Sequence, residues 1–207
     1  MLSFFKSDKR KTTRGLSYYD RENIVHNIKD LENVLDPVGK KEYTRQETIK
    51  YSGMALEDIT ENKIINLFAE ADFIIEDFES MQNYKVLFYR HPVGKYTFVM
   101  QFHFYRGSFF FLTNMVSVAG VLTSLDKKTI IEKITKKNFP GLDLDLSKSN
   151  EIKVSDANNC FISVEDGVHF RVSYVNNSLK NQELLNKSDF VAPQPEEDYD
   201  SMIDDLL

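Results

Sequence analysis

The fold is decided by residues 96–104, which read YTFVMQFHF and place a large apolar side chain at every second position. These apolar residues are Tyr96, Phe98, Met100, Phe102 and Phe104, and mostly polar residues lie between them. Successive side chains of a strand point to opposite faces of the sheet, so this period of two predicts a strand with one apolar face. We therefore expect a half-buried antiparallel strand at the centre of the fold.

Similar runs flank this strand on both sides. Residues 84–88 precede a predicted turn, HPVG at 91–94, and residues 109–115 follow a second predicted turn, RGS at 106–108. Turn residues between alternating runs are typical of hairpins, so we expect a three-stranded meander from Tyr84 to about Val116. Residues 73–78 (FIIEDF) predict a further strand, at an edge of the sheet because charges interrupt its apolar run.

Two helices are predicted to seal the apolar face of the meander. The first is capped by Thr60 and carries Ile64, Ile65, Phe68 and Ala71 on one side. The second is capped by Ser124, ends at Asn138, and carries three isoleucines on one side, Ile130, Ile131 and Ile134. Both have the helical spacing of apolar residues that packs against a sheet.

A second hairpin is predicted around Asp166-Gly167, with alternating apolar residues on both sides of the turn. Before it, residues 142–146 alternate Leu with Asp, which predicts either a short strand or an extended connection. After it, residues 178–186 predict a short helix. The core domain is therefore expected to span residues 59–188.

The N-terminal part, residues 1–58, is expected to be a basic arm followed by a helical extension. Asp20 could cap a helix that carries Ile24, Ile28, Leu31 and Leu35 on one face. Residues 40–58 are expected to be a connection with a short helix near 45–51. The expected fold class is α+β: an antiparallel sheet, meander plus hairpin, packed by two to three helices, with this extension and a disordered acidic tail at 189–207.

Composition limits the broad class. Of the 207 residues 42% are hydrophobic, which suffices for a packed core. The single cysteine, Cys160, cannot form an internal disulfide, and we expect it to be a buried thiol in a protein of a reducing compartment, the cytoplasm. Residues 107–125 carry no charge, but their Ser, Thr, Asn and Gly content predicts a buried strand and a turn rather than a membrane span.

Charge is distributed unevenly along the chain, whose net charge is -6. Residues 1–21 carry six bases against two acids, and residues 189–207 carry seven acids and no base. The C-terminal segment combines acids with apolar residues, which suits docking on a basic, apolar-floored surface of another protein. A role as a solubilising appendage remains open, and the residues expected to bind a partner are Asp200, Ile203, Asp204, Asp205, Leu206 and Leu207.

No catalytic motif is recognisable: the chain has no phosphate-binding glycine loop, dinucleotide fingerprint, paired-cysteine spacing or serine elbow. His103 and His169, with Glu165 nearby in sequence, are the one combination that could ligate a metal, but histidines on a polar face are more often solvated. We expect no metal, no cofactor and no enzymatic activity. A candidate basic patch, which could equally be an ordinary exposed helix face, consists of Lys127, Lys128, Lys133, Lys136 and Lys137.

The order helix, strand, hairpin, strand, helix, hairpin, helix from Thr60 to Asn186 resembles the α/β layout of type III secretion chaperones and the related YbjN-type proteins. The resemblance implies a small, acidic, non-enzymatic protein that binds other proteins through its sheet and often dimerises. The arm of about sixty residues before Thr60 departs from that layout.

The functional hypothesis is therefore a protein-binding adaptor or chaperone-like protein whose acidic and apolar C-terminal peptide docks on a partner. The alternative is a single-stranded nucleic-acid-binding protein, because such proteins combine aromatic-rich sheets with basic tracks and acidic tails.

Overall fold

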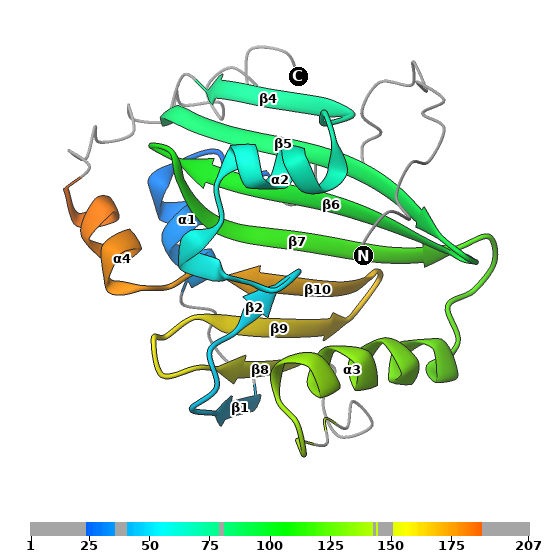
Figure 1. The fold of residues 1–207 in the computed structure, drawn as a ribbon. Helices are drawn as coiled ribbons and strands as arrows, with labels where there is room; N and C mark the ends of the chain where they lie inside the picture. The colour runs from blue at the N-terminus through cyan, green and yellow to red at the C-terminus, as the bar shows by residue number, and fades with distance from the viewer. Residues whose placement is uncertain (1–23, 36–40, 79–80, 143, 145–150, 188–207) are drawn as a thin grey trace, which may run out of the picture.

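An eight-stranded sheet organises the molecule, with strand order β1-β8-β9-β10-β7-β6-β5-β4 (Figure 1). The computed structural model describes residues 24–35, 41–78, 81–142, 144 and 151–187. The fold is α+β, and its elements are α1 (Ile28–Leu35), β1 (Lys41–Thr44), β2 (Lys50–Tyr51), β3 (Met54–Ala55), the 3₁₀ helix η2 (Leu56–Asp58), α2 (Glu61–Phe68), β4 (Phe73–Phe78), β5 (Met81–Val93), β6 (Tyr96–Tyr105), β7 (Ser108–Val118), α3 (Ser124–Asn138), β8 (Glu151–Ser155), β9 (Phe161–Asp166), β10 (Phe170–Val175) and α4 (Leu179–Asn186).

Strands β4 to β7 form a continuous antiparallel meander, and β4 lies at the edge of the sheet as predicted. The predicted turn between β6 and β7 is confirmed: Arg106 and Gly107 have φ angles of 49° and 75°. Two consecutive positive φ angles are what a two-residue hairpin turn requires. The turn expected at 91–94 is displaced, because β5 continues to Val93 and the reversal falls on Gly94 and Lys95.

The other half of the sheet is larger than the predicted hairpin. Strands β8, β9 and β10 form a second antiparallel meander, and β10 pairs with β7 to join the two halves. β1 adds a parallel strand beside β8, so the sheet is mixed rather than antiparallel. The expected Asp166-Gly167 turn is instead a three-residue loop, residues 167–169, which places Arg171 opposite Glu165.

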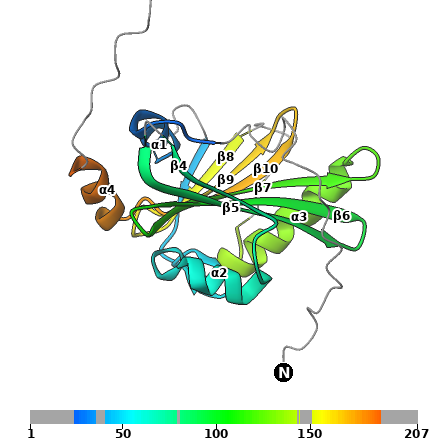
Figure 2. The same ribbon diagram turned by 90° about the horizontal axis from the view of Figure 1, so that it is seen from above.

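The first core cluster lies on the face of the sheet that the alternating residues of β6 predict. Met100, Phe102 and Phe104 are buried, and Tyr96 and Phe98 pack partly buried against the same cluster. Helices α2 and α3 cover this face, as Figure 2 shows from above. The prediction of a core sealed by these two helices is therefore confirmed.

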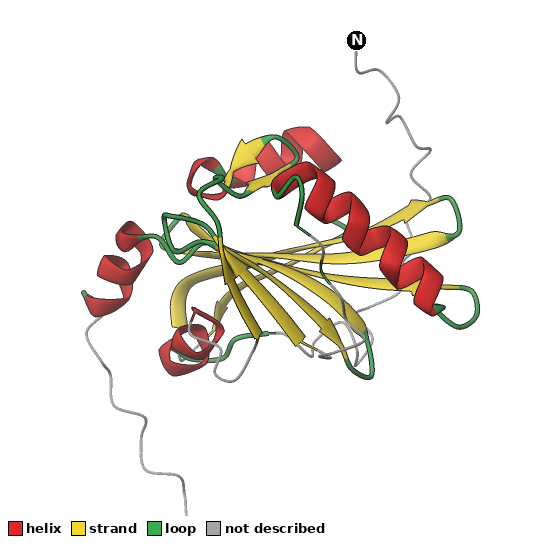
Figure 3. Ribbon diagram, turned by 90° about the horizontal axis from the view of Figure 1, so that it is seen from below, coloured by secondary structure: helices red, strands yellow, loops and turns green. Residues whose placement is uncertain are grey.

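A second core cluster covers the opposite face and includes Leu31 and Leu35 of α1. The expectation of a half-buried central strand is wrong, because Gln101 and His103 on this face of β6 are fully buried. Figure 3 shows the sheet between helices on both sides. The polar residues of β6 predicted a solvent-facing surface, but a buried polar group is tolerated where it forms hydrogen bonds.

An irregularity in the β6–β7 pairing explains how three consecutive phenylalanines are all buried. The register shifts between His103 and Phe104, where Phe111 and Phe109 are the respective partners. Phe109 consequently joins the first cluster, while Phe110 and Phe111 both join the second. Phe110 is the extra residue in β7, since it has no opposite residue in β6. An extra residue in one strand changes the face of the sheet on which the following side chains lie.

The helix ends follow the capping residues closely. Thr60 caps α2, as predicted, and accepts a hydrogen bond from the Lys63 N–H at 3.4 Å. α3 is capped by Thr123 rather than Ser124, in a reciprocal capping box with Asp126. The Asp20 cap expected for α1 lies outside the described residues.

The segment expected to be a connection holds real structure. Residues 41–58 form β1, the small β2–β3 hairpin and η2, and Ile49 and Leu56 are buried in the first core. The short helix expected near residues 45–51 is absent there, since Lys50 and Tyr51 form β2. Too few apolar residues alternate in these short strands to produce a periodic signal.

The uncharged stretch at 107–125 forms β7 and the approach to α3. Among the described residues no helix has the length and apolarity needed to cross a membrane.

Candidate functional site

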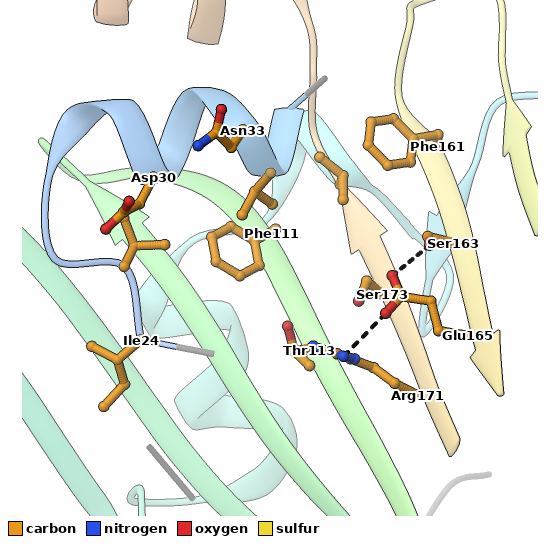
Figure 4. Close-up of a pocket in the computed structure, with 13 residues that line it drawn as sticks. Ile24, Asp30, Asn33, Phe111, Thr113, Phe161, Ser163, Glu165, Arg171 and Ser173 are labelled. Carbon is orange, nitrogen blue, oxygen red and sulfur yellow. Dashed lines mark hydrogen bonds and ion pairs between the residues drawn. The ribbon is translucent and has the colours of Figure 1, made fainter. Parts of the chain in front are cut away.

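The candidate site is a pocket between α1 and strands β7, β9 and β10, on the face of the sheet opposite α2 and α3 (Figure 4). We call it the α1 pocket; its volume is about 310 Å³ and its lining is Ile24, Val25, Asp30, Asn33, Val34, Phe111, Thr113, Phe161, Ser163, Glu165, Arg171, Ser173 and Val175. This volume lies at the small end of the range for small-molecule sites, roughly 300–1,000 Å³.

Strand register orders the floor of the α1 pocket into three rows across β7, β10 and β9. The apolar row is formed by Phe111, Val175 and Phe161, which are neighbours in the ladder. The hydroxyl row, two residues further along, is formed by Thr113, Ser173 and Ser163. The charged row comes next, with Arg171 opposite Glu165. Consecutive rows are about 7 Å apart, because a strand advances about 3.4 Å per residue.

The charged row is held by direct contacts. Arg171 Nη2 lies 3.1 Å from Glu165 Oε2, and Ser163 Oγ donates a hydrogen bond to Glu165 Oε1 at 3.2 Å. The Arg171 and Glu165 side chains are 34% and 20% exposed, so the ion pair is accessible from the pocket but partly shielded from water. Charges in such a setting interact more strongly than charges on an open surface.

Helix α1 closes the pocket over the apolar row. Val34 of this helix is part of the pocket lining, while Leu31 and Leu35 are buried in the second core. Two hydrogen bonds hold the first turn of the helix: Asn27 Oδ1 accepts from the Asp30 N–H at 2.9 Å, and the Asp30 carboxylate accepts from the His26 N–H at 3.1 Å. The pocket roof is therefore a short helix fixed at its first turn and along its apolar side.

His103 lies in the second core and is not in the lining of the α1 pocket. Its Nδ1 shares a hydrogen bond with the Tyr84 hydroxyl, and its ring stacks on Phe111 with the ring centroids 3.8 Å apart. Burial lowers the pKa of His103 well below the usual value, so the imidazole is neutral. His169 lies instead in the loop between β9 and β10. Within the described ranges no group of three or more His, Cys, Asp or Glu residues is arranged to hold a metal ion.

Cys160 is buried, as expected, and burial raises the pKa of its thiol to about 12. A thiolate is the reactive form of cysteine, and this thiol stays protonated at neutral pH.

The candidate basic patch on α3 is not one uniform surface. Lys127 is bound to Asp166 at 2.6 Å and Lys128 lies 3.9 Å from Glu132. Lys133, Lys136 and Lys137 are exposed, and Lys136 and Lys137 lie in the last turn of the helix, where cations interact favourably with the helix dipole. The five lysines therefore have different local environments.

The second candidate surface is the free edge of β4. Phe73 and Ile74 are adjacent in this strand, so they point to opposite faces of the sheet, and they are 44% and 45% exposed. Among the described residues β4 pairs with β5 only, which leaves its outer row of backbone groups without a neighbouring strand. Residues 70–76 (EADFIIE) contain three acids, all exposed, and no base, so this edge is both apolar and acidic.

The predicted partner-binding residues of the C-terminal segment, Asp200, Ile203, Asp204, Asp205, Leu206 and Leu207, lie outside the described residues. The sheet aromatics that motivated the nucleic-acid hypothesis are buried: Phe102, Phe104, Phe109, Phe110 and Phe111 are each at most 2% exposed. Rings in this position are not available to stack on bases.

Comparisons of the chain with protein-family models, with curated proteins and with solved structures give no match.

Proposed function

We propose that this protein is a non-enzymatic protein-binding adaptor that takes up an extended segment of a partner at the free edge of β4. The observation that carries the proposal is the exposed pair Phe73 and Ile74 on a strand whose outer backbone groups face no other described strand. An added peptide strand would bond to the backbone of β4 and cover these two side chains, one on each face of the sheet.

The negative charge of the β4 edge determines which kind of partner segment it can bind. Glu70, Asp72 and Glu76 are exposed acids close to the apolar pair in sequence. Lys85, on the neighbouring strand β5, lies 2.8 Å from Glu76 and 2.9 Å from Glu61. Two copies paired through this edge would bring like charges together, which disfavours self-association. A basic segment with apolar residues at alternate positions is the complementary partner.

The experiment is a titration with an eight-residue peptide of alternating Lys and Val, followed by fluorescence anisotropy and by amide chemical shifts. We expect the shifts to concentrate on residues 72–78 and a peptide of alternating Glu and Val to bind at least tenfold more weakly. A Lys-Val peptide methylated on alternate backbone nitrogens should lose binding, because it cannot donate the ladder hydrogen bonds.

The matched variants are Ile74→Lys on β4 and Leu179→Lys on α4, two exposed apolar residues replaced by the same cation. Ile74→Lys should weaken the Lys-Val peptide at least tenfold, while Leu179→Lys should leave its affinity unchanged. Equal affinities for both variants, or shifts located away from β4, would refute the assignment of the edge.

An adaptor needs a second contact, and we assign it to the C-terminal segment on the basis of its sequence. Ile203, Leu206 and Leu207 would serve as apolar anchors, with Asp200, Asp204 and Asp205 opposite basic residues of the second partner. Deletion of residues 198–207 should remove this second interaction and leave the affinity for the Lys-Val peptide unchanged. Loss of both together would show that the two contacts are not separate.

A further inference from the structure

We propose that the α1 pocket binds a free α-amino acid with an aromatic or branched apolar side chain. This site is separate from the β4 edge, because its floor is formed by β7, β9 and β10. The inference rests on the order of the three rows on that floor, which runs from charged through hydroxyl to apolar.

The charged row selects the head group of the ligand. Arg171 and Glu165 place one positive and one negative group 3.1 Å apart. A ligand with a single charge would meet an opposite charge and a like charge at the same place. A zwitterion avoids this conflict, because its carboxylate pairs with the Arg171 guanidinium while its ammonium pairs with the Glu165 carboxylate.

The remaining rows select the body of the ligand. A side chain that extends from the charged row passes Thr113, Ser173 and Ser163 and reaches toward the Phe111, Val175 and Phe161 row under α1. The two steps cover about 14 Å between backbone positions, which accommodates a single amino acid and its side chain. The volume of about 310 Å³ likewise suits a small ligand rather than a folded peptide.

Calorimetric titration of the full chain tests the ligand class with four probes. L-Phenylalanine is expected to bind, phenethylamine and 3-phenylpropionate each keep the ring but lose one charge, and glycine keeps the head group but loses the ring. We expect each of the last three to bind at least tenfold more weakly than L-phenylalanine. Comparable binding of either singly charged probe would overturn the proposal. So would the absence of heat from L-phenylalanine and from two further candidate ligands, L-leucine and L-tryptophan.

Two variants test whether the ligand binds at Arg171 and Glu165, because each should reverse the preference for L-phenylalanine over one singly charged probe. Arg171→Met should weaken L-phenylalanine at least tenfold but leave phenethylamine as tight or tighter, because the repelling cation is gone. Glu165→Gln should do the same in favour of 3-phenylpropionate. A variant that merely unfolds would lose all probes together, so the reversed preference is specific to the site.

Lys180→Met is the matched control, because Lys180 is an exposed cation on α4 outside the pocket lining. It should bind every probe as the unaltered protein does. If Arg171→Met and Glu165→Gln also bind L-phenylalanine as the unaltered protein does, the ligand does not occupy the α1 pocket and the proposal fails.

Discussion

The Tyr84 hydroxyl and Nδ1 of His103 lie 2.5 Å apart in the second core, on neighbouring strands β5 and β6. Burial lowers the pKa of His103, so the folded protein holds this imidazole neutral. The unfolded chain takes up a proton at its ordinary pKa of about 6.5, and acid therefore favours unfolding. We expect the free energy of unfolding to fall below pH 6.5 by up to about 1.4 kcal/mol per pH unit from this group.

Urea denaturation at several pH values between 7.5 and 5 measures this slope. His103→Gln should flatten it, because the group that takes up the proton is removed. An unchanged slope in His103→Gln would contradict the assignment of a neutral buried imidazole.

Phe102 is the residue whose truncation should cost the most stability. Its side chain is fully buried, and its ring lies within 5.6 to 6.5 Å of the rings of Tyr51, Phe68, Tyr89 and Phe109. Phe102→Ala should lower the free energy of unfolding by about 3–5 kcal/mol, since it leaves a cavity among these rings. Val121→Ala, at a residue 86% exposed, should change it by less than about 0.5 kcal/mol. Equal denaturation midpoints for Phe102→Ala and Val121→Ala would contradict the burial of Phe102 in the first core.

Asp126 joins the start of α3 to the β5–β6 turn. The stability lost in Asp126→Asn should therefore depend on pH. Its carboxylate accepts from the Tyr96 hydroxyl at 2.9 Å and pairs with Lys95 at 2.5 Å. The Lys95 ammonium and the Thr123 hydroxyl and N–H hold the pKa of Asp126 well below its usual value. A lowered pKa stabilises the folded state above about pH 4, and this contribution is lost as pH falls through the folded pKa.

Melting temperatures of Asp126→Asn and the unaltered protein should therefore differ most above pH 5, and the difference should shrink progressively as the pH is lowered below 4 toward the folded pKa of Asp126. A difference that stays constant across this range would mean that the charge of Asp126 is not involved.

Asn181 ties α4 to the sheet through its amide. Its Nδ2 donates to the carbonyl oxygens of Phe109 and Asn176 at 2.8 and 2.9 Å, and the residue is 1% exposed. Asn181→Ala should lower the free energy of unfolding by about 1–3 kcal/mol, because buried carbonyls lose a donor. Gln182→Ala is the neighbouring comparison; Gln182 is half-buried, and its replacement should cost less. A larger loss of stability in Gln182→Ala than in Asn181→Ala would contradict the role of Asn181 in holding α4 to the sheet.

The first core could be predicted from the sequence because the period of two in β6 reports directly which residues share a face. The predicted cap at Thr60 and the helix predicted over residues 178–186 likewise placed α2 and α4 within a residue of their observed starts. Gln101 and His103 could not be placed, since their polarity suggests water while α1, far away in sequence, contributes to the core over this face. A local pattern does not encode the element that covers it.

The α1 pocket left a weak signal in the sequence. Ser163, Glu165, Arg171 and Ser173 occupy the polar positions that alternate with apolar ones in β9 and β10. Their pairing depends on the three-residue loop between the strands, and the expected two-residue turn shifts Arg171 away from Glu165. The third strand of the floor, β7, lies more than forty residues before β9, so its contribution required the full sheet order.

The parallel pairing of β1 with β8 has a consequence for how the chain is made. Glu42 and Lys153, which form an ion pair across these strands, are 111 residues apart. A ribosome adds roughly 5–20 residues per second, so β1 waits for its partner for about 6 to 22 seconds after it is synthesised. Closing so long a loop is also slow relative to forming adjacent hairpins. We therefore expect the β4–β7 meander to form during translation while β1 is still without β8, so that the nascent chain exposes a strand that cellular chaperones can bind.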